Sequence, residues 1–589
     1  MLPNVRNRWA RWVRGPLPTW HHPDYRMPLA SIEARTGAEP RRADYVAWHL
    51  VATGALKPRD LKSPPLVSWH DLSRAHEDSL LRSLDDCEVL ARIYGTDPAE
   101  IMVDEIMRTV RLACGGTLEA ARAALAEGRP TVNLLGGFHH AHPDRAGGSC
   151  AVNDIAVAVA ALRDAGFDER VSVIDLDAHP PDGTAACLAR DEAAWIGSIS
   201  GSDWIALPGV DETVLPPGCG DGVYLETLDG LLARRPESGL VFVLAGGDVL
   251  RGDRLGRLGL TLEGALERDA RVLASLGRTP SVWLPAGGYH PDAWRLFAGT
   301  ANLLATGRKE PVPKGPDPMR GQFAGIAAGL DTRKLGNDEW ITAADLEGAL
   351  GGRETEPRLL GNYTASGIEY AMYRYGVLTQ LQRLGYQNVR VRLDSGEIGD
   401  RMRMYGTAGG LEHLLGETVL SRDRVEGKPV LFIHWMTLRN PRALFSANRP
   451  RLRGQEVPGL GMAREAGEML GRIALRLGLT GVAFRPMHLH SAWTARHEFH
   501  FVDAPRQARF EALMRDAKGR SLPIIDAALE EGRVLLDGAP YRWEPDVMVS
   551  WLESAGLDEA SVIRRKDALK FKFLEVGAAP VEDREATSR

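Results

Sequence analysis

The segment at residues 171–183, VSVIDLDAHPPDG, constrains what this chain can fold into more than any other stretch. Apolar residues lead into Asp175, Asp177 and His179, which are separated by one residue each. Alternate side chains of a strand point to the same face, so these polar groups are expected to converge at a buried strand's carboxyl end. Removing them from water is costly, and a divalent metal ion offsets that cost. A capped strand end with a Pro180–Pro181 turn is the competing interpretation.

Two other segments end in polar residues of the same kind. The run VNLLGGF (132–138) leads into His139 and His140, and LVFVLAGG (240–247) leads into Asp248. Adjacent histidines point in opposite directions in extended backbone, which favours two different roles for them. Because ligands gather at the carboxyl ends of parallel strands, the three strand ends together predict one polar site at an edge of an α/β sheet.

Longer stretches around these strand ends carry a family resemblance. They are GGFHHAHPDRAGGSCAVNDIA (136–156), DLDAHPPDGTAA (175–186), LPPGCGDGVYLETL (215–228), AGGDVLRGDRLGRLGLT (245–261) and PAGGYHPDAW (285–294). In order and spacing they resemble the zinc-dependent histone deacetylase family, within the arginase/deacetylase superfamily. Residues 41–56 and 67–84 resemble the amino-terminal part of its bacterial members. The resemblance covers residues 18–310 and implies an α/β fold with a parallel sheet flanked by helices.

The resemblance also implies a metal centre. Asp177, His179 and Asp248 match the family's ligands for one Zn²⁺ ion, and a structural K⁺ ion is a further expected cofactor. Three protein ligands leave positions open for water and substrate, as a hydrolytic centre requires.

Five residues match the family's catalytic groups. His140 corresponds to the general base and His139 to its electrostatic or acidic support, while Asp175 and Asp182 match the carboxylates that orient the two imidazoles, in that order for His139 and His140. Tyr289 matches the tyrosine that donates a hydrogen bond to the tetrahedral oxyanion. The implied reaction is metal-assisted hydrolysis of an amide.

Three segments depart from the family pattern. Pro180 and Pro181 stiffen the turn that carries Asp182, where the family has His or Gln followed by Gly. Ser149 replaces the Phe that walls the acyl-lysine channel in eukaryotic members, and Trp204 is a candidate for the opposite wall. These changes spare the catalytic residues and alter the channel, so we expect retained chemistry on a shifted substrate.

The sequence therefore predicts a deacetylase that hydrolyses an N-acyl amide, such as acetyl-lysine, an acetylated polyamine or another small amine. One alternative is a weakened acyl-lysine-binding module whose function lies in the C-terminal domain. Another is an arginase-like ureohydrolase, but Pro181 stands where that reaction needs an aspartate, and Val249 follows Asp248 where it needs a histidine.

Composition narrows the partners and the compartment. The chain of 589 residues has a net charge of −6 and a pI near 6.3, which argues against a generic nucleic-acid binder. No apolar run approaches the ~18 residues of a membrane span, and the start lacks the apolar core of a signal peptide. We expect a cytoplasmic protein with an acylated amine as substrate, no nucleic-acid or membrane partner, and a homo-oligomeric state. The five cysteines are expected to be reduced: Cys87, Cys114, Cys150, Cys187 and Cys219.

Four segments are expected along the chain: a zinc hydrolase domain (1–310), a linker with a short helix near Thr342 (311–358), an α+β domain of unknown function (359–574) and a disordered tail (575–589). At the start, Trp9 and Trp12 are expected to pack a short surface helix onto the first domain, and binding to a membrane or an acidic partner is the less favoured alternative for this segment. In the α+β domain, residues 364–385 predict one helix, and residues 388–394, 428–438, 481–493 and 497–503 predict strands.

Two features of the α+β domain suggest ligands. RGQEVPGLGMAREAG (453–467) loosely resembles the pyrophosphate loop of acetyltransferases of the GNAT type, although a Gly-Pro turn that starts a helix is the simpler interpretation. His488 and His490 are expected on one face of a strand, with His497 and His500 on the next. No acidic or cysteine ligand completes a metal set there, and strand histidines that face solvent are commoner.

Overall fold

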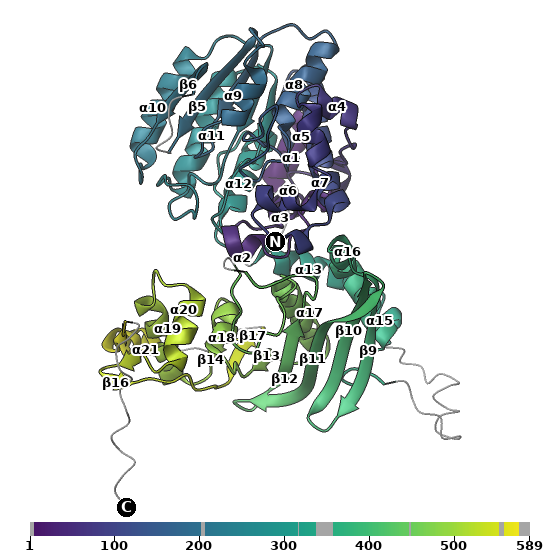
Figure 1. The fold of residues 1–589 in the computed structure, drawn as a ribbon, viewed down its shortest axis with the longest axis vertical. Coiled ribbons are helices and arrows are strands. Elements are labelled where there is room, and N and C mark those ends of the chain that lie inside the picture. Colours follow the sequence, from purple (N-terminus) through teal and green to yellow (C-terminus); the bar gives the residue numbers. More distant parts are fainter. Residues whose placement is uncertain are drawn as a thin grey trace, which may run out of the picture. The chain divides into compact units, whose positions relative to one another are not determined.

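The computed structural model contains two large sheets and one small one among the residues that it describes. These are residues 5–201, 207–315, 317–336, 357–446, 449–552 and 559–575. The chain divides into the units Met1–Gln322 and Phe323–Arg589, and each builds its own sheet architecture (Figure 1). Trp204, the helix expected near Thr342 and the tail beyond residue 575 lie outside the described residues.

The N-terminal unit contains a parallel sheet of eight strands in the order β2-β1-β3-β8-β7-β4-β5-β6. The strands are β1 (Thr19–Trp20), β2 (Leu61–Lys62), β3 (Pro130–Asn133), β4 (Val171–Asp175), β5 (Ala194–Ser200), β6 (Val210–Val214), β7 (Leu240–Leu244) and β8 (Ser281–Leu284). The parallel sheet predicted from the sequence is confirmed.

Helices cover both faces of this sheet because β4 and β7 are apolar on both faces. Ile174 and Val241 pack into one core with α3 (Arg42–Ala52), α10 (Asp221–Arg234), α11 (Leu262–Leu276) and α12 (Ala293–Thr306). Val173 and Phe242 pack into the other with α5 (Asp78–Ser83), α6 (Cys87–Tyr94), α7 (Val103–Glu127) and α8 (Asp154–Asp164). The other helices of this unit are α1 (Val5–Arg14), α2 (Ile32–Thr36), α4 (Trp69–Ser73) and α9 (Asp182–Leu188).

The C-terminal unit is α+β, as predicted, with a sheet in the order β14-β17-β13-β12-β11-β10-β9. Its strands are β9 (Gln387–Gly396), β10 (Gly399–Ala408), β11 (Leu411–Val425), β12 (Lys428–Leu438), β13 (Gly481–Phe484), β14 (His500–Phe501) and β17 (Met548–Trp551). Strands β9 to β12 form an antiparallel meander, whereas β12 and β13 are parallel and are joined through α17 (Ala463–Arg476).

The remaining elements complete this part of the chain. A small sheet holds β15 (Val534–Leu536), β16 (Ala539–Pro540) and β18 (Phe571–Phe573). The helices are α13 (Pro318–Ala328), α15 (Ala365–Arg374), α16 (Val377–Arg383), α18 (Leu489–Ala495), α19 (Ala504–Asp516), α20 (Leu522–Glu530) and α21 (Glu559–Ala568).

Several local predictions for the C-terminal unit are wrong. The helix expected over 364–385 breaks into α15 and α16 at Gly376, whose φ of 77° is left-handed. The strand expected over 481–493 ends at Phe484, and the chain then forms α18. His488 therefore lies at the start of a helix and His490 within it, so the two do not share a strand face.

The prediction for the tryptophans of α1 is also wrong. Trp9 is 64% exposed and Trp12 is 81% exposed, whereas Asn7 and Ala10 face the domain.

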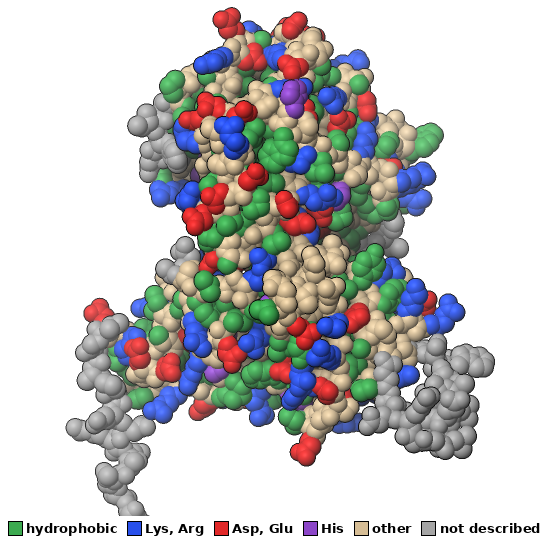
Figure 2. Space-filling model, turned by 45° about the vertical axis from the view of Figure 1, so that its right-hand side comes forward, with side chains coloured by type: hydrophobic (Ala, Val, Ile, Leu, Met, Phe, Trp, Pro, Cys, Tyr) green, Lys and Arg blue, Asp and Glu red, His purple; other side chains and the backbone are tan. Residues whose placement is uncertain are grey.

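Within the described residues no helix is long and apolar enough to cross a bilayer. On the face seen in Figure 2, acidic and basic side chains are interspersed and do not form a stripe of one sign.

Candidate active site

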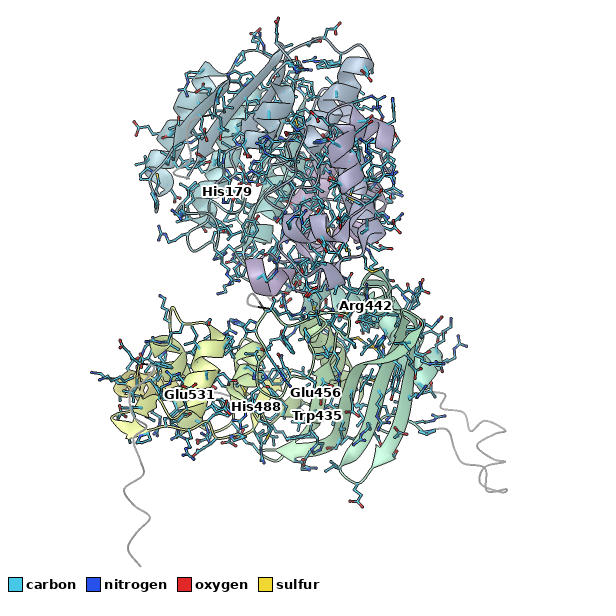
Figure 3. The ribbon with its side chains drawn as sticks, viewed as in Figure 1. His179, Trp435, Arg442, Glu456, His488 and Glu531 are labelled. Carbon is cyan, nitrogen blue, oxygen red and sulfur yellow. The ribbon has the colours of Figure 1, made fainter. Side chains whose placement is uncertain are left out.

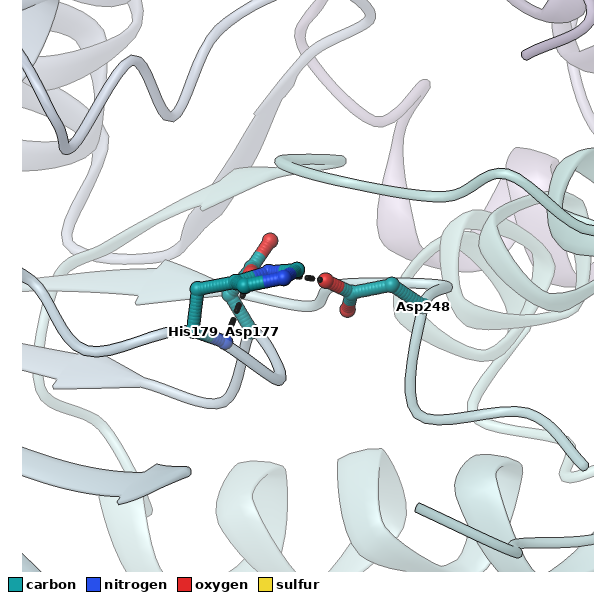
Figure 4. Close-up of side chains that lie close together, drawn as sticks. All are labelled: Asp177, His179 and Asp248. Carbon is teal, nitrogen blue, oxygen red and sulfur yellow. Dashed lines mark hydrogen bonds and ion pairs between the residues drawn. The ribbon is translucent and has the colours of Figure 1, made fainter. Parts of the chain in front are cut away.

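Asp177, His179 and Asp248 come together beyond the carboxyl ends of β4 and β7. One ligand atom from each lies within 4.8 Å of the other two. His179 Nδ1 is 3.0 Å from Asp177 Oδ1 and 3.0 Å from Asp248 Oδ2 (Figure 4). Both carboxylates are buried, and His179, which is labelled in Figure 3, is of intermediate burial. The loops after two neighbouring strands thus build a compact cluster of nitrogen and oxygen ligands.

Backbone groups of the surrounding loops hold this cluster in place. Gly287 N donates to Asp177 Oδ2 at 2.7 Å, and Ala178 N donates to Asp248 Oδ1 at 3.0 Å. A Cβ atom at position 287 would lie 2.6 Å from Asp177 Oδ2, so only glycine lets the loop after β8 approach this closely.

The cluster carries an unfavourable charge arrangement. Burial and the neighbouring Asp177 carboxylate raise the pKa of Asp248 to about 7. Two buried carboxylates at hydrogen-bonding distance from one imidazole form a donor set that suits a divalent cation. Nearby, the Ser198 hydroxyl is buried beside Asp175 in the sheet and has no hydrogen-bond partner among the described residues.

His139 and His140 each face a carboxylate. His139 Nδ1 lies 2.9 Å from Asp175 Oδ2, and His140 Nδ1 lies 2.7 Å from Asp182 Oδ1. Burial alone would lower the pKa of His139, but Asp175 and Asp177 outweigh it and raise the pKa to about 9. For His140, burial and the neighbouring His139 lower the pKa. The adjacent histidines thus differ in proton affinity.

Asp182 also contacts a second histidine that sequence reasoning did not single out. Its Oδ2 lies 3.0 Å from His142 Nε2, so each carboxylate oxygen faces one imidazole. Pro180 and Pro181 form the turn before α9, and Asp182 is the first residue of that helix. The stiff turn thus presents Asp182 to both imidazoles.

Tyr289 lies on the loop after β8 and is tied to the loop that carries Asp248. Asp253 Oδ2 accepts a hydrogen bond from Tyr289 N at 2.7 Å, while its Oδ1 accepts from Leu255 N and Gly256 N, both at 2.9 Å. Burial raises the pKa of Tyr289, with Asp177 and Asp248 adding to the effect, so the phenol keeps its proton. Asp253 was quoted within a motif but given no role by sequence reasoning.

Arg42 is a further residue that sequence reasoning missed. Its NH2 donates to Ala286 O at 2.6 Å, and it lines a small pocket with Leu134, Gly247 and Gly287. Burial lowers the pKa of this guanidinium, which faces the negative cluster. Arg42 lies in the RRADYVAWHL stretch (41–50), which is part of the family resemblance, but nothing local in the sequence distinguishes it from its neighbour Arg41.

Ser149, which departs from the family pattern at the channel wall, has a left-handed backbone conformation. Ser149 has a φ of 62°, and the preceding Gly148 has a φ of 55°. A Cβ atom at position 148 would lie 2.3 Å from His140 Cδ2. The GGS segment therefore packs directly against the His140 ring, and the small Ser149 side chain follows it.

His76 is hydrogen-bonded to the backbone of the turn that contains His139 to His142. Its Nδ1 donates to His142 O at 2.9 Å, and its Nε2 accepts from Asn153 N at 2.9 Å. Asn153 in turn caps α8 by accepting from Ala156 N. Burial lowers the pKa of His76 to about 4. Protonation would also remove the ring acceptor that Asn153 N uses.

This geometry predicts a pH-dependent stability. Unfolded His76 titrates near 6.5, whereas the folded residue resists protonation down to about 4, so stability falls as the pH drops through that window. At pH 5 the unfolding free energy should be about 2 kcal/mol lower than at pH 7.5 because of His76. Urea unfolding of His76→Gln at both pH values is expected to show a pH difference smaller by that amount than the wild type. The exposed His70→Gln variant serves as control, and an unchanged pH difference in His76→Gln would contradict the account.

Sequence comparisons with known proteins match the part of the chain that contains this site. Residues 37–302 match the family model described as the histone deacetylase domain. The chain is 32% identical over 299 residues to histone deacetylase 2 of Arabidopsis thaliana, covering 48% of this chain and 76% of the relative. It is 30% identical over 286 residues to an uncharacterized protein of Picosynechococcus, covering 46% of this chain and 92% of that one.

A vertebrate relative matches at a comparable level. Histone deacetylase 8 of Xenopus tropicalis is 29% identical over 297 residues, which covers 45% of this chain and 78% of the relative. The family motifs lie on the same loops that carry the Asp177, His179 and Asp248 cluster and the two histidine–carboxylate pairs. On the extent of these matches, the chain belongs to the histone deacetylase family.

Proposed function

We propose that the chain is a zinc-dependent deacetylase that hydrolyses an acetylated amine, with acetyl-lysine or an acetylated polyamine as the leading candidates. The observation that carries this proposal is that the ligand cluster and the His140–Asp182 pair meet at the same strand ends. The products are acetate and the free amine.

The residues of the cluster fit a divalent cation. Asp177, His179 and Asp248 would hold it, and its positive charge would relieve the repulsion that raises the pKa of Asp248. When bound there, Zn²⁺ supplies Lewis acidity toward the amide carbonyl and toward water. The unpartnered Ser198 hydroxyl supports a K⁺ ion as a second, structural cofactor.

His140 is the residue best placed to accept a proton from the attacking water. Because Nδ1 faces Asp182 Oδ1 at 2.7 Å, the ring hydrogen sits on Nδ1 and the Nε2 lone pair is free. His139, held by Asp175, lies beside it with ring centroids 4.1 Å apart. The Tyr289 hydroxyl is the donor for the oxyanion that develops on the substrate carbonyl.

The ureohydrolase alternative is less well supported. It requires a second metal with additional carboxylate ligands, and the described residues contain one cluster of three or more such ligands. An acyl-lysine-binding module would bind the acylated amine without hydrolysing it, so a measurement of hydrolysis decides between this alternative and the proposal.

The test is hydrolysis by the full chain. Release of acetate from acetyl-lysine peptides and acetylpolyamines is expected, a chelator should abolish it, and added Zn²⁺ should restore it. A screen across both substrate classes and longer acyl chains ranks the substrates, since Ser149 stands where eukaryotic members of the family have an aromatic wall. Zinc-loaded protein that hydrolyses none of them would support the binding-module alternative instead.

A second function, binding of an acyl-CoA, is favoured for the C-terminal unit by its sheet. β12 pairs with β13 only over Val430–Ile433, and β12 then continues to Leu438 paired with β11 alone. A β-bulge at His434 marks the point where the two parallel strands part. Ligands bind where parallel strands open at a topological switch, and an extended ligand can pair with such a free strand edge.

The residues around this opening suit an extended ligand with phosphates. Trp435 lies on β12 just past the bulge (Figure 3) and is 51% exposed. The Gly459–Gly461 segment returns to the end of β12, where Asn440 N donates to Pro458 O at 2.7 Å, and it leads directly into α17. The start of α17 has no side-chain cap, and the backbone N–H groups of a helix start can bind an anion such as a pyrophosphate.

Calorimetric titration of the full chain with acetyl-CoA tests this second function. Saturable binding is expected, and Gly461→Val, at a φ of 69°, should weaken it about tenfold by distorting the segment before α17. Gly478→Val, at a φ of 68° beyond the other end of α17, is the matched control and should bind as the wild type does. Absence of saturable binding by the wild type would refute the proposal.

A further inference from the structure

The outward face of α1 is apolar although it lies in solvent. Val5, Trp9, Trp12 and Val13 are 76%, 64%, 81% and 55% exposed. Their spacing of four, three and one residues places them on one side of the helix. This group, named here the α1 apolar face, is a contiguous surface that water solvates poorly.

The opposite face of α1 anchors the helix to the N-terminal unit. Asn7 Nδ2 donates to Asn302 Oδ1 at 3.3 Å and to Thr53 O at 3.4 Å, and Arg11 NH1 donates to Gly54 O at 3.3 Å. Arg129 NH1 donates to Arg14 O at 2.7 Å at the helix end. These contacts hold the helix in one rotation about its axis, so the tryptophans are directed outward.

The charge of α1 selects the kind of partner. The helix contains Arg6, Arg8, Arg11 and Arg14 and no acidic residue. Arg6 and Arg8 are exposed at the two borders of the α1 apolar face. An isologous contact between two copies of this face would bring Arg6 and Arg8 of each copy together, four guanidinium groups in all, which disfavours self-association through it. The combination calls for a surface that is both negatively charged and apolar beneath the charge.

We propose that the α1 apolar face binds the surface of an anionic lipid bilayer, with the helix lying in the interface. Tryptophan rings favour the headgroup level of a bilayer, and flanking arginines reach the lipid phosphates. A peripheral contact of this kind needs no membrane-spanning helix. It is independent of the proposed deacetylase activity and would hold the N-terminal unit at a membrane.

The test is co-sedimentation of the full chain with vesicles. Binding is expected to vesicles of phosphatidylglycerol and phosphatidylcholine, to be far weaker with phosphatidylcholine alone, and to fall as salt screens the arginines. The double variant Trp9→Ser/Trp12→Ser should lower the partition coefficient about tenfold or more. Arg6→Gln/Arg8→Gln should reduce both the binding and its salt dependence.

Trp69→Ser is the matched control, because Trp69 is a 40% exposed tryptophan elsewhere in the same unit. Control and double variant should both keep the wild-type circular dichroism spectrum and hydrolytic rate in solution, which shows that they fold. Wild-type protein that does not co-sediment with anionic vesicles would overturn the proposal. It would also be overturned if, in analytical ultracentrifugation, the wild type is a dimer and the double variant is a monomer, since a second copy of the chain would then cover the α1 apolar face.

Discussion

Replacing His140 with alanine is expected to lower kcat for acetyl-lysine hydrolysis by about 10²–10⁴-fold. The variant loses the Nε2 lone pair that is proposed to accept the proton of the attacking water, while the ligand cluster stays intact. The loss should appear in kcat and in kcat/KM alike, because the proton transfer belongs to the transition state. Steady-state kinetics with zinc quantified in each preparation makes the measurement.

Two neighbouring variants sharpen this prediction. Asp182→Asn keeps the shape of the side chain but weakens the hold on the His140 tautomer, so its kcat should fall between those of the wild type and His140→Ala. His142→Ala removes the second imidazole on Asp182 and leaves the His140 contact, so its loss should be smaller still. A His140→Ala enzyme of near wild-type rate would exclude His140 as the base.

Replacing Tyr289 with phenylalanine is expected to lower kcat by about 10²–10³-fold. The change removes one hydroxyl and leaves the backbone contact between Tyr289 N and Asp253 untouched. Because the hydroxyl is assigned to the developing oxyanion, KM should change little. A Tyr289→Phe enzyme that loses only substrate affinity would contradict this role.

Asp253 provides the test of how Tyr289 is positioned. Asp253→Ala should lower kcat about 10-fold to 100-fold by releasing the loop that aims the phenol. In a Tyr289→Phe background the same substitution should have no further effect on kcat, because no hydroxyl remains to be aimed. Additive losses in the double variant would mean that Asp253 acts by another route.

The strand-end residues of the site were predictable because each is encoded locally. Asp177 and His179 follow β4 at a spacing of two, and Asp248 follows the apolar run of β7. Parallel strands in a sheet with covered faces are continuous apolar runs, so their ends are visible in a single sequence. Their convergence follows from the rule that such ends share one edge.

The C-terminal unit was less predictable because its strands lack that pattern. β11 carries charged residues at intervals that match neither a buried strand nor an amphipathic one, and pairing with β10 and β12 stabilises it. Residues 489–495 read as a strand continuation but form α18, since Leu489 and Ala492 find their core against the other helices of that unit. Local pattern cannot supply these partners.

The sequence by itself determined the parallel sheet and the polar ends of its strands, because those depend on periodicity, and its motifs carried the family resemblance that assigned the ligand set and the two histidine–carboxylate pairs. Only the tertiary structure decided that Asp182 faces both His140 and His142, that Asp253 holds the Tyr289 loop, and that Arg42 lies at the pocket. It also decided the orientation of α1, where Asn7 and Ala10 take the buried side and leave Trp9 and Trp12 in solvent. Each of these depends on contacts between residues distant in the chain, and such contacts leave no local pattern.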